Sequence, residues 1–494
     1  MAKQCSPSEP VEQLTTLLSL PDDCLAALLR HLSQKQRAAA ALVCRRLRAV
    51  CQSAASLWES VELQLSLSDP RALERTEGFL AFHIPRAAAV HKLAIAAERG
   101  GSAAAAAAAA EAGASGPLPH LTAAHLSLVF SNLVSALTLM GASLKHLSID
   151  WPDDLQLSQW LGTLTALESG SFTAPRITVR PGLGSLPRLK DLRFRSTKKP
   201  LAFASSHGSP GRHAHSSAAA ALGAPLLPPH LLKLRLEGCH LTELPAPLGR
   251  LTCLEDLVLS DNNLQAARLS VLSRLASLQS LTLMGCSMSA LPPALSALTN
   301  LRVLYLDMGI QAPAGPDAPP MHRQCDLLLG PLERLAILSM GACHLQAFPS
   351  ELVSHTALRA LYLDDNSLTS LPAGTYLEQL RVLGIDWRVL FNSHAVLRHA
   401  PHLSKLCLMS MGKLELEAAM SSEADVAAVV ASLTRHPSLR QVLLPSLDGH
   451  RSQLYIAALN VLIGISRAQH LEVRACSYNN IGNEWLDWLH TNGW

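Results

Sequence analysis

One leucine pattern recurs along the chain and constrains its fold more than any other feature. Leucine or a related apolar residue fills the first, fourth and sixth positions of a short phrase, and Asn or Cys fills the ninth. Clear copies begin at Leu231, Leu254, Leu278 and Leu358. Alternate residues of a strand point to the same side, so the leucines of one phrase face one core while the Asn or Cys turns the chain. One phrase cannot bury its leucines alone, so successive phrases must stack.

This phrase is the leucine-rich repeat, and it predicts an α/β fold: a leucine-rich-repeat solenoid, or horseshoe, over residues 64–484. Several successive phrases start 23 residues apart, which indicates one solenoid of about fifteen coils. Further strand cores are predicted to begin at Val90, Leu121, Leu144, Leu167, Leu189, Leu301, Leu335, Leu380, Leu403, Leu439 and, more weakly, Leu471.

Longer steps between phrases indicate insertions. The alanine run at 100–116 and the Ser-, His- and Pro-rich stretch at 197–229 are low in complexity. The stretches at 309–330 and 410–437 are interpreted either as ordered loops over the binding face or as expanded spacers, and the second contains a predicted helix from Glu415 to Leu433.

The two ends of the chain carry different patterns. Residues 1–16 are a polar lead that we expect to be disordered. Residues 485–494 contain Trp485, Trp488 and Trp494, and we interpret them as a C-terminal cap on the last coil.

Residues 17–63 have helical instead of repeat periodicity. Pro21 opens a first helix whose leucines recur at helical spacing. Ser33 and Gln36 resemble a capping box for a second helix, and a basic stretch continues as a third helix that ends near Trp58. Three short helices bury little surface alone, so they need a neighbour.

The separated anchors Leu20-Pro21-Asp22, Leu42-Val43-Cys44-Arg45-Arg46 and Leu57-Trp58 resemble the F-box. The resemblance implies docking onto the Skp adaptor of a cullin-RING ubiquitin ligase. The residues that it implies contact the adaptor are Leu20, Pro21, Leu28, Leu29, Leu32, Leu42 and Val43.

Three positions depart from the F-box pattern, and a second interpretation stays open. Leu47 stands where many F-boxes carry Trp, and Gln34 and Arg37 stand where leucine is usual, which we expect to weaken the adaptor-facing surface. Alternatively, residues 17–63 are a helical cap that protects the first coil. A cap should pack on the first coil, whereas an F-box should leave Leu20 and Pro21 open.

Composition limits the environment and the partners. The formal net charge of +3 gives no reason to expect nucleic acid or a membrane surface as a partner. No apolar run approaches the roughly 20 residues of a membrane span, and Met1 to Pro10 do not form a signal peptide. The 11 cysteines show no framework of close spacings, and three of them fill the Asn position of the repeat. We therefore expect reduced thiols and a cytoplasmic or nuclear protein.

The sequence offers little for catalysis. It contains no phosphate-binding loop, nucleophile elbow, zinc-protease motif or dinucleotide fingerprint, so we predict neither an enzyme nor a cofactor. His207, His213 and His215 lie close together in a Ser- and Gly-rich stretch, which favours a solvated linker over a metal site.

Two surfaces are candidates for binding. Side chains between the leucines stack into columns on the concave face, and aromatic and arginine residues there are typical of interfaces. The predicted substrate-binding residues are Arg302, Tyr305, Asp307, Arg359, Tyr362, Asp364, Arg381, Asp386 and Trp387. The alternative is that the Arg and Asp columns pair with each other. A second, basic surface suits an acidic or phosphorylated segment or is merely solvated; it comprises Arg188, Lys190, Arg193, Arg195, Lys198 and Lys199.

Together these features predict an F-box and leucine-rich-repeat protein that acts as the substrate receptor of a ubiquitin ligase. The F-box would hold the adaptor, and through it a cullin, while the repeats hold an unidentified protein substrate. The rival hypothesis is a signalling scaffold with no connection to ubiquitin.

Overall fold

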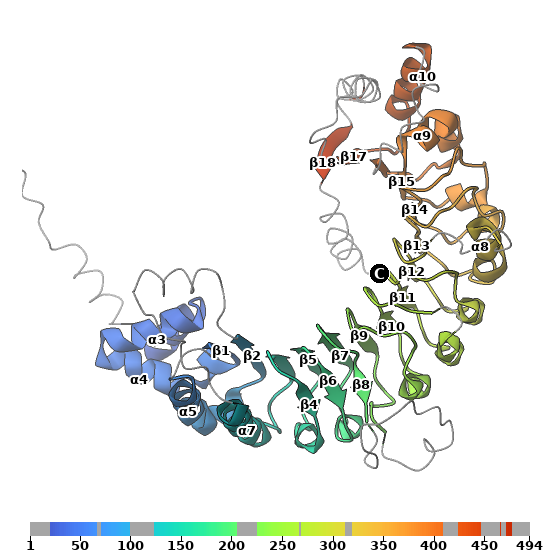
Figure 1. Cartoon of the computed structure of the whole chain (residues 1–494). Coiled ribbons are helices and arrows are strands. Elements are labelled where there is room, and N and C mark those ends of the chain that lie inside the picture. The colour runs from blue at the N-terminus through green and yellow to red at the C-terminus, as the bar shows by residue number, and fades with distance from the viewer. Residues whose placement is uncertain are drawn as a thin grey trace, which may run out of the picture. The chain divides into compact units, whose positions relative to one another are not determined.

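The computed structural model divides the chain into two compact units, Met1–Leu231 and Leu232–Trp494. The residues that the structure describes are 20–66, 71–98, 123–204, 225–265, 268–311, 319–408, 423–445, 465 and 471–476. The first unit holds a group of short helices and the strands β1 to β8, and the second unit holds a longer run of parallel strands (Figure 1).

The short helices are α2 (Asp22–Arg30), α3 (Gln34–Val43), α4 (Arg45–Ser53) and the 3₁₀ helix η1 (Ala55–Trp58). The predicted capping box is confirmed. The Gln36 amide N donates to Ser33 Oγ over 3.3 Å, and the Ser33 amide N donates to Gln36 Oε1 over 2.8 Å. Cys44 has extended backbone angles, so it separates α3 from α4.

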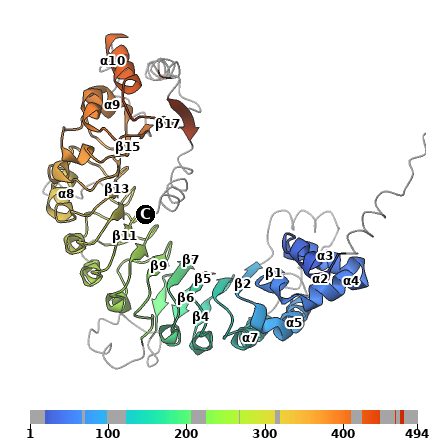
Figure 2. The same ribbon diagram turned by 180° about the vertical axis from the view of Figure 1, so that it is seen from behind.

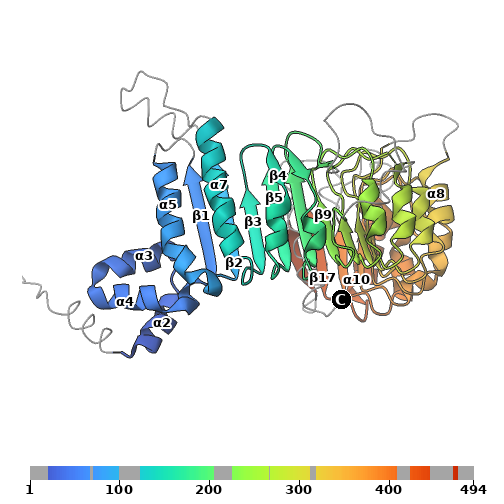
Figure 3. The same ribbon diagram turned by 90° about the horizontal axis from the view of Figure 1, so that it is seen from below.

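A parallel sheet follows, in the order β1-β2-β3-β5-β7. Helices α5 (Ala72–His83) and α7 (Ala123–Leu139) lie side by side, and α5 contacts β1 (Figure 3). A smaller parallel sheet, β4-β6-β8, forms from β4 (Leu155–Leu157), β6 (Ile177–Val179) and β8 (Ala202–Phe203). The main strands are β1 (Ser60–Ser66), β2 (Lys92–Glu98), β3 (His146–Asp150), β5 (Ser169–Ala174) and β7 (Asp191–Ser196).

The second unit repeats one coil many times. Its strands are β9 (Lys233–Leu236), β10 (Asp256–Val258), β11 (Ser280–Thr282), β12 (Val303–Tyr305), β13 (Ile337–Ser339), β14 (Ala360–Tyr362), β15 (Val382–Ile385), β16 (Lys405–Leu408), β17 (Gln441–Pro445) and β18 (Glu472–Cys476). They pair in chain order and all in parallel. Among the described residues most crossovers contain 3₁₀ turns, and the α-helices are α8 (Met321–Leu329), α9 (Trp387–Ser393) and α10 (Glu423–Thr434). These helices lie on one side of the strands (Figure 2). We call the opposite side, on which none of these three helices lies, the open face.

The repeated Asn and Cys positions hold adjoining coils together. The Asn262 side chain accepts from the Leu241 amide N over 2.9 Å and donates to the Leu236 and Leu259 carbonyls over 2.7 Å each. The buried Cys286 thiol donates to the Leu259 carbonyl over 3.2 Å, and burial raises its pKa to about 12. A buried backbone carbonyl needs a donor, and either residue type supplies one.

Most predicted strand positions are confirmed, with strands beginning two residues after the first apolar residue of the predicted cores. Leu121 lies outside the described residues. Two features differ from prediction. Strand β1 begins at Ser60, inside the stretch expected to be helical, and the β4-β6-β8 sheet was not expected.

The predicted insertions are described only in part. Their described helices and strands are β8, α8 and α10. The alanine run, the polar lead and the C-terminal cap lie outside the described residues, and of the helix predicted from Glu415 only residues from 423 onward are described. The predicted domain boundaries remain a prediction.

Candidate docking surfaces

Apolar side chains lie exposed on α2 and α3. Leu42 is 76% exposed, Val43 59% and Leu28 48%, and Pro21 is exposed at the start of α2. Exposed large apolar side chains in one small helical group are typical of a protein-binding surface. Leu20 and Leu32 are half-buried.

Leu29 differs from the sequence prediction. It is only 6% exposed and is buried, as Leu25 is. Helical spacing places it one turn after Leu25, on the face that packs inward. Leu29 therefore packs inside the helical group and is not available for contact with a partner.

Arg46, at the end of the Leu42–Arg46 segment, holds the Leu20-Pro21-Asp22 segment in place. Its Nη2 donates to the Leu20 carbonyl over 2.6 Å and to Asp22 Oδ1 over 2.9 Å. The ion pair is largely exposed, so its direct contribution to stability is small. Its consequence is geometric, because it holds Leu20 and Pro21 beside the start of α4.

Arg37 and Gln34 connect the helical group internally, and their expected effect on an adaptor-facing surface stays a prediction. The Arg37 Nε donates to the carbonyls of Leu29 over 3.1 Å and Leu32 over 2.8 Å, and its Nη1 donates to the Leu57 carbonyl. These bonds join the end of α2 and the residues just after it to η1. Gln34 Oε1 accepts from the Glu62 amide N over 2.7 Å and so ties α3 to strand β1.

An aromatic cluster joins the helical group to α5. The Trp58 Nε1 donates to the Cys51 carbonyl over 2.7 Å, and the Trp58 ring meets Phe82 and His83 edge to face at centroid distances of 5.0 and 5.4 Å. Burial, with a smaller contribution from the Arg86 charge, lowers the pKa of His83 to about 4. His83 is therefore neutral at physiological pH, and the cluster is apolar in effect.

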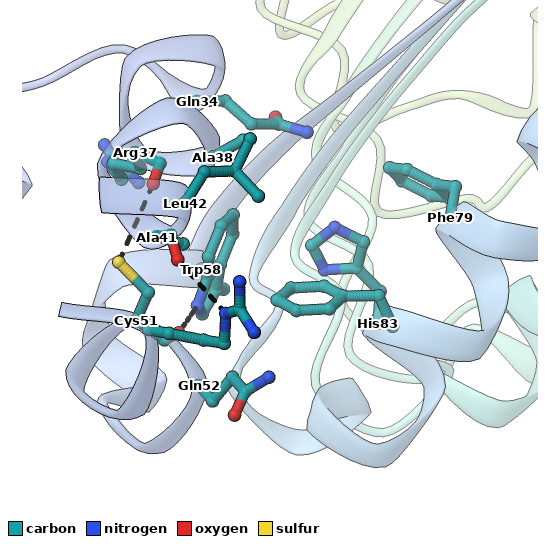
Figure 4. Close-up of a pocket in the computed structure, with 12 residues that line it drawn as sticks. Gln34, Arg37, Ala38, Ala41, Leu42, Cys51, Gln52, Trp58, Phe79 and His83 are labelled. Atoms are coloured by element: carbon teal, nitrogen blue, oxygen red, sulfur yellow. Dashed lines mark hydrogen bonds between the residues drawn. The ribbon is translucent and has the colours of Figure 1, made fainter. Parts of the chain in front are cut away.

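A cavity of about 330 Å³ opens beside this cluster, between α3 and α4 on one side and α5 on the other (Figure 4). Trp58 and His83 line it together with Phe79. None of its lining residues is acidic, and Arg37 and Arg48 are both among them. Leu42 also lines the cavity, which makes the cavity continuous with the exposed apolar residues of α3. The lining residues are Gln34, Arg37, Ala38, Ala41, Leu42, Arg48, Cys51, Gln52, Trp58, Phe79, Phe82 and His83.

The second candidate surface is the open face of the second unit. Strand register places Tyr305, Ser339 and Tyr362 in one row across successive strands, followed by Gly384, Cys407 and Leu443. The Tyr362 ring lies across Gly384, where a Cβ atom would collide with it. An apolar cluster results, and its buried members are Ile337, Ala360, Tyr362, Val382, Cys407 and Leu443.

Three carboxyl groups lie at the carboxyl ends of these strands. Asp307 Oδ1 accepts from Ser339 Oγ over 2.5 Å and from the Gly341 amide N over 2.9 Å. Burial, reinforced by the Asp307 charge, raises the pKa of Asp364 to about 7, and burial raises that of Asp386 to about 6. Gly341 leaves room between two of them, since a Cβ there would approach Asp307 Oδ1 at 2.8 Å and Asp364 Oδ2 at 3.2 Å.

The predicted substrate-binding residues therefore fall into two groups. Arg302 and Arg381 are exposed, and Tyr305 and Asp307 are half-buried. Arg359 is also half-buried, and its Nη1 donates to the Ala357 carbonyl over 2.9 Å. In contrast to the prediction, four residues are buried and are not available surface: Tyr362, Asp364, Asp386 and Trp387. Neighbouring coils lie one strand spacing apart, so bulky side chains at these positions cover one another.

The predicted basic surface lies on and around β7 of the first unit, and all six of its residues are exposed. Arg193 and Arg195 project from the same face of β7, next to Ser171 and Thr173 of β5. Lys199 forms an ion pair with Asp154 over 3.7 Å. His207, His213 and His215 lie outside the described residues. In the part of the chain that the structure describes, no three His, Cys, Asp or Glu residues are placed to hold a metal ion.

The sequence analysis missed the cavity. Its signal was the run Phe79, Phe82 and His83, three rings at helical spacing in a chain that is only 4% aromatic. The role of Arg46 was missed as well, because its partner Leu20 is 26 residues away in sequence.

Comparisons with known proteins agree with the helical group. Residues 17–64 match the F-box-like family model. Among curated proteins, none matches the chain. Two solved structures are similar in part. An internalin of Listeria monocytogenes has 16% identity and a TM-score of 0.43 over 76% of this chain and 94% of its own. A leucine-rich-repeat protein of Leptospira interrogans has 16% identity and a TM-score of 0.39 over 69% and 91%. No described helix is long and apolar enough to cross a membrane.

Proposed function

Because this chain joins an F-box-like domain at residues 17–64 to leucine-rich repeats, we propose that it is the substrate-recognition subunit of an SCF-type ubiquitin ligase. The F-box-like domain binds the Skp adaptor, and the repeats bind a protein substrate. The single observation that carries the proposal is the exposure of the large apolar side chains Leu28, Leu42 and Val43 inside the matched domain.

Two further contacts support adaptor docking. Arg46 holds Leu20 and Pro21 in place, so these two residues have a fixed position in the unbound chain. Such preorganisation lowers the entropic cost of binding. The cavity beside Leu42 extends the apolar surface, and its two arginines with no acidic residue suit an apolar partner segment that carries negative charge.

In this role the chain is a bridge and takes no part in the chemistry. It raises the effective concentration of a substrate lysine near the conjugating enzyme, and the reacting thioester belongs to other chains of the ligase. The proposed role belongs to the cytoplasm or the nucleus.

Co-purification with the Skp adaptor tests the proposal. Leu42→Arg places a charge at an exposed apolar position of α3 without disturbing the core, and we expect at least tenfold weaker adaptor binding. Leu327→Arg is a matched control, because Leu327 on α8 is also 76% exposed, and it should bind as the wild type does. Absence of adaptor binding by the folded wild-type chain would contradict the proposal.

One observation favours a second function, a scaffold without ubiquitin involvement. The helical group packs on the first coil through Gln34 and the Trp58 cluster, as a protective cap should. In that case Leu42→Arg would leave the binding of every partner unchanged. Gln34→Ala and Trp58→Ala, by contrast, would destabilise the first unit.

A further inference from the structure

The cavity between the helical group and α5 has a wall of aromatic rings. His83 lies between Phe79 and Trp58 in this wall (Figure 4). Its ring centroid is 4.5 Å from that of Phe79, 4.9 Å from that of Phe82 and 5.4 Å from that of Trp58. Aromatic groups pack favourably against such rings, either offset or edge to face. The wall therefore suits an aromatic ligand.

His83 has a buried polar atom without a partner. The residue is only 3% exposed, and its Nδ1 forms no hydrogen bond with any described residue. Buried polar atoms are nearly always hydrogen-bonded, so an exception at a cavity wall indicates a missing partner. In a neutral histidine, Nδ1 is a donor in one tautomer and an acceptor in the other. A hydroxyl group satisfies either tautomer.

The other polar groups of the lining add positive charge. Arg37 donates to four backbone carbonyls, and the exposed Arg48 donates from Nε to the Ala41 carbonyl over 3.2 Å. Carbonyl groups do not neutralise a guanidinium, and no residue that lines the cavity is acidic. A negatively charged group on a ligand therefore complements the charge of this site.

The size and position of the cavity are those of a ligand site. Its volume of about 330 Å³ is in the range of pockets that hold small molecules. Such pockets are largely apolar, contain a few polar groups and often lie where two parts of a chain meet. Leu42 lines this cavity and is 76% exposed, so the cavity is next to solvent at α3.

From these observations we propose that the cavity binds an aromatic group that carries a hydroxyl and lies beside a negative charge. The hydroxyl forms a hydrogen bond with His83 Nδ1. The aromatic group packs against Phe79 and Trp58, and Arg48 attracts the negative charge. Such a group belongs either to a free aromatic acid or to a tyrosine beside an acidic residue in a partner. Only the second source rests on the proposed function.

Calorimetric titration of the full chain with para-hydroxycinnamate tests the proposal. We expect saturable binding. Cinnamate, which lacks the hydroxyl, and para-hydroxycinnamamide, which lacks the charge, should each bind at least about fivefold more weakly. Equal affinity for para-hydroxycinnamate and cinnamate would overturn the proposal, as would absence of binding by the folded chain. Because these comparisons change the ligand and leave the protein as it is, they do not depend on the folding of a variant.

Two variants test the roles of individual side chains. His83→Phe keeps a ring but has no nitrogen, so it should bind para-hydroxycinnamate and cinnamate with equal affinity. Arg48→Gln should likewise lose the preference for the acid over the amide. Arg45→Gln is the matched control and should keep that preference, because Arg45 is exposed on the same helix but does not line the cavity. A hydroxyl preference that survives in His83→Phe would contradict the proposed hydrogen bond.

The same titration with the Skp adaptor bound separates the two sources of the ligand. Loss of probe binding in the complex would assign the cavity to a segment of the adaptor, whereas unchanged affinity would assign it to a free ligand. A chain that binds the probe but not the adaptor would contradict the proposed function and leave the ligand site intact.

Discussion

The strands of the first unit and those of the second unit have open faces of opposite character, although the same repeat builds both. On the first unit this face carries small or polar side chains, among them Ala94, Ala96 and Ser148, and ends in the exposed Arg193 and Arg195. On the second it carries a buried apolar cluster with tyrosines. The leucine core fixes only the alternate positions of each strand. The positions between them are free to become either a solvated surface or a second apolar layer.

The same contrast extends to ionisable groups. The second unit buries carboxyl groups beside its apolar cluster, and their pKa values rise. In the first unit the most perturbed group is His83, a buried base whose pKa falls. Both shifts have burial as their largest cause, which disfavours the charged form of either group. The raised pKa values of the carboxyl groups make stability fall as pH rises, whereas the lowered pKa of His83 makes stability fall as pH falls.

The largest expected effect is that of removing the main side chain of this apolar cluster. Tyr362→Ala should lower the free energy of unfolding by about 3–5 kcal/mol, since it opens a cavity across Gly384. Arg193→Ala on the open face of the first unit should change it by less than about 0.5 kcal/mol. Urea denaturation measures both. Similar losses of unfolding free energy for the two variants would contradict the difference between the two open faces.

The buried acids predict that stability falls as pH rises. The folded pKa of Asp364, about 7, exceeds its ordinary value of 3.8. The folded state therefore binds the proton more tightly, and stability is lost between pH 4 and pH 7. The loss should be on the order of 2–4 kcal/mol. Asp364→Asn should flatten this dependence and be at least as stable as the wild type at pH 8. A steeper dependence in the variant would contradict the assignment.

His83 predicts the reverse dependence for the first unit. Its folded pKa of about 4 lies below the ordinary 6.5, so stability is complete above pH 6.5 and is lost as pH falls toward 4. The loss should be about 2–3 kcal/mol. His83→Phe keeps a ring against Phe79 and Phe82 and cannot be protonated. Thermal denaturation at pH 7 and pH 4.5 should show a smaller difference for this variant than for the wild type, and an unchanged difference would rule out His83 as the source.

The smallest effect concerns the outer strand of the first unit. Gln34→Ala removes the acceptor of the Glu62 amide N, and we expect a loss of about 1 kcal/mol with adaptor binding unchanged. Gln64→Ala, two residues along the same exposed face of β1, should have no measurable effect. Denaturation of both variants checks whether this hydrogen bond joins the helical group to the sheet. Equal stability would show that the aromatic cluster alone makes the connection.

The sequence predicted the repeated strands well and the binding surfaces only in part. Strand cores such as those at Leu254 and Leu358 are marked by spacing within one phrase, and the capping box at Ser33 is equally local. Tyr362 and Asp364 were expected on an accessible surface, yet they are buried. Whether they are covered depends on the neighbouring coils, more than 20 residues away in sequence.

By itself, the sequence determined the parallel repeats and the helical group with its F-box-like anchors. Each follows from local periodicity, because alternation along a strand and spacing along a helix set the direction of a side chain. Only the tertiary structure decided that Arg37 turns inward to four backbone carbonyls, that Arg46 holds Leu20, and that Trp58 meets His83 beside a cavity. Those contacts join residues up to 26 positions apart, and the position of a distant partner is fixed only when the chain has packed.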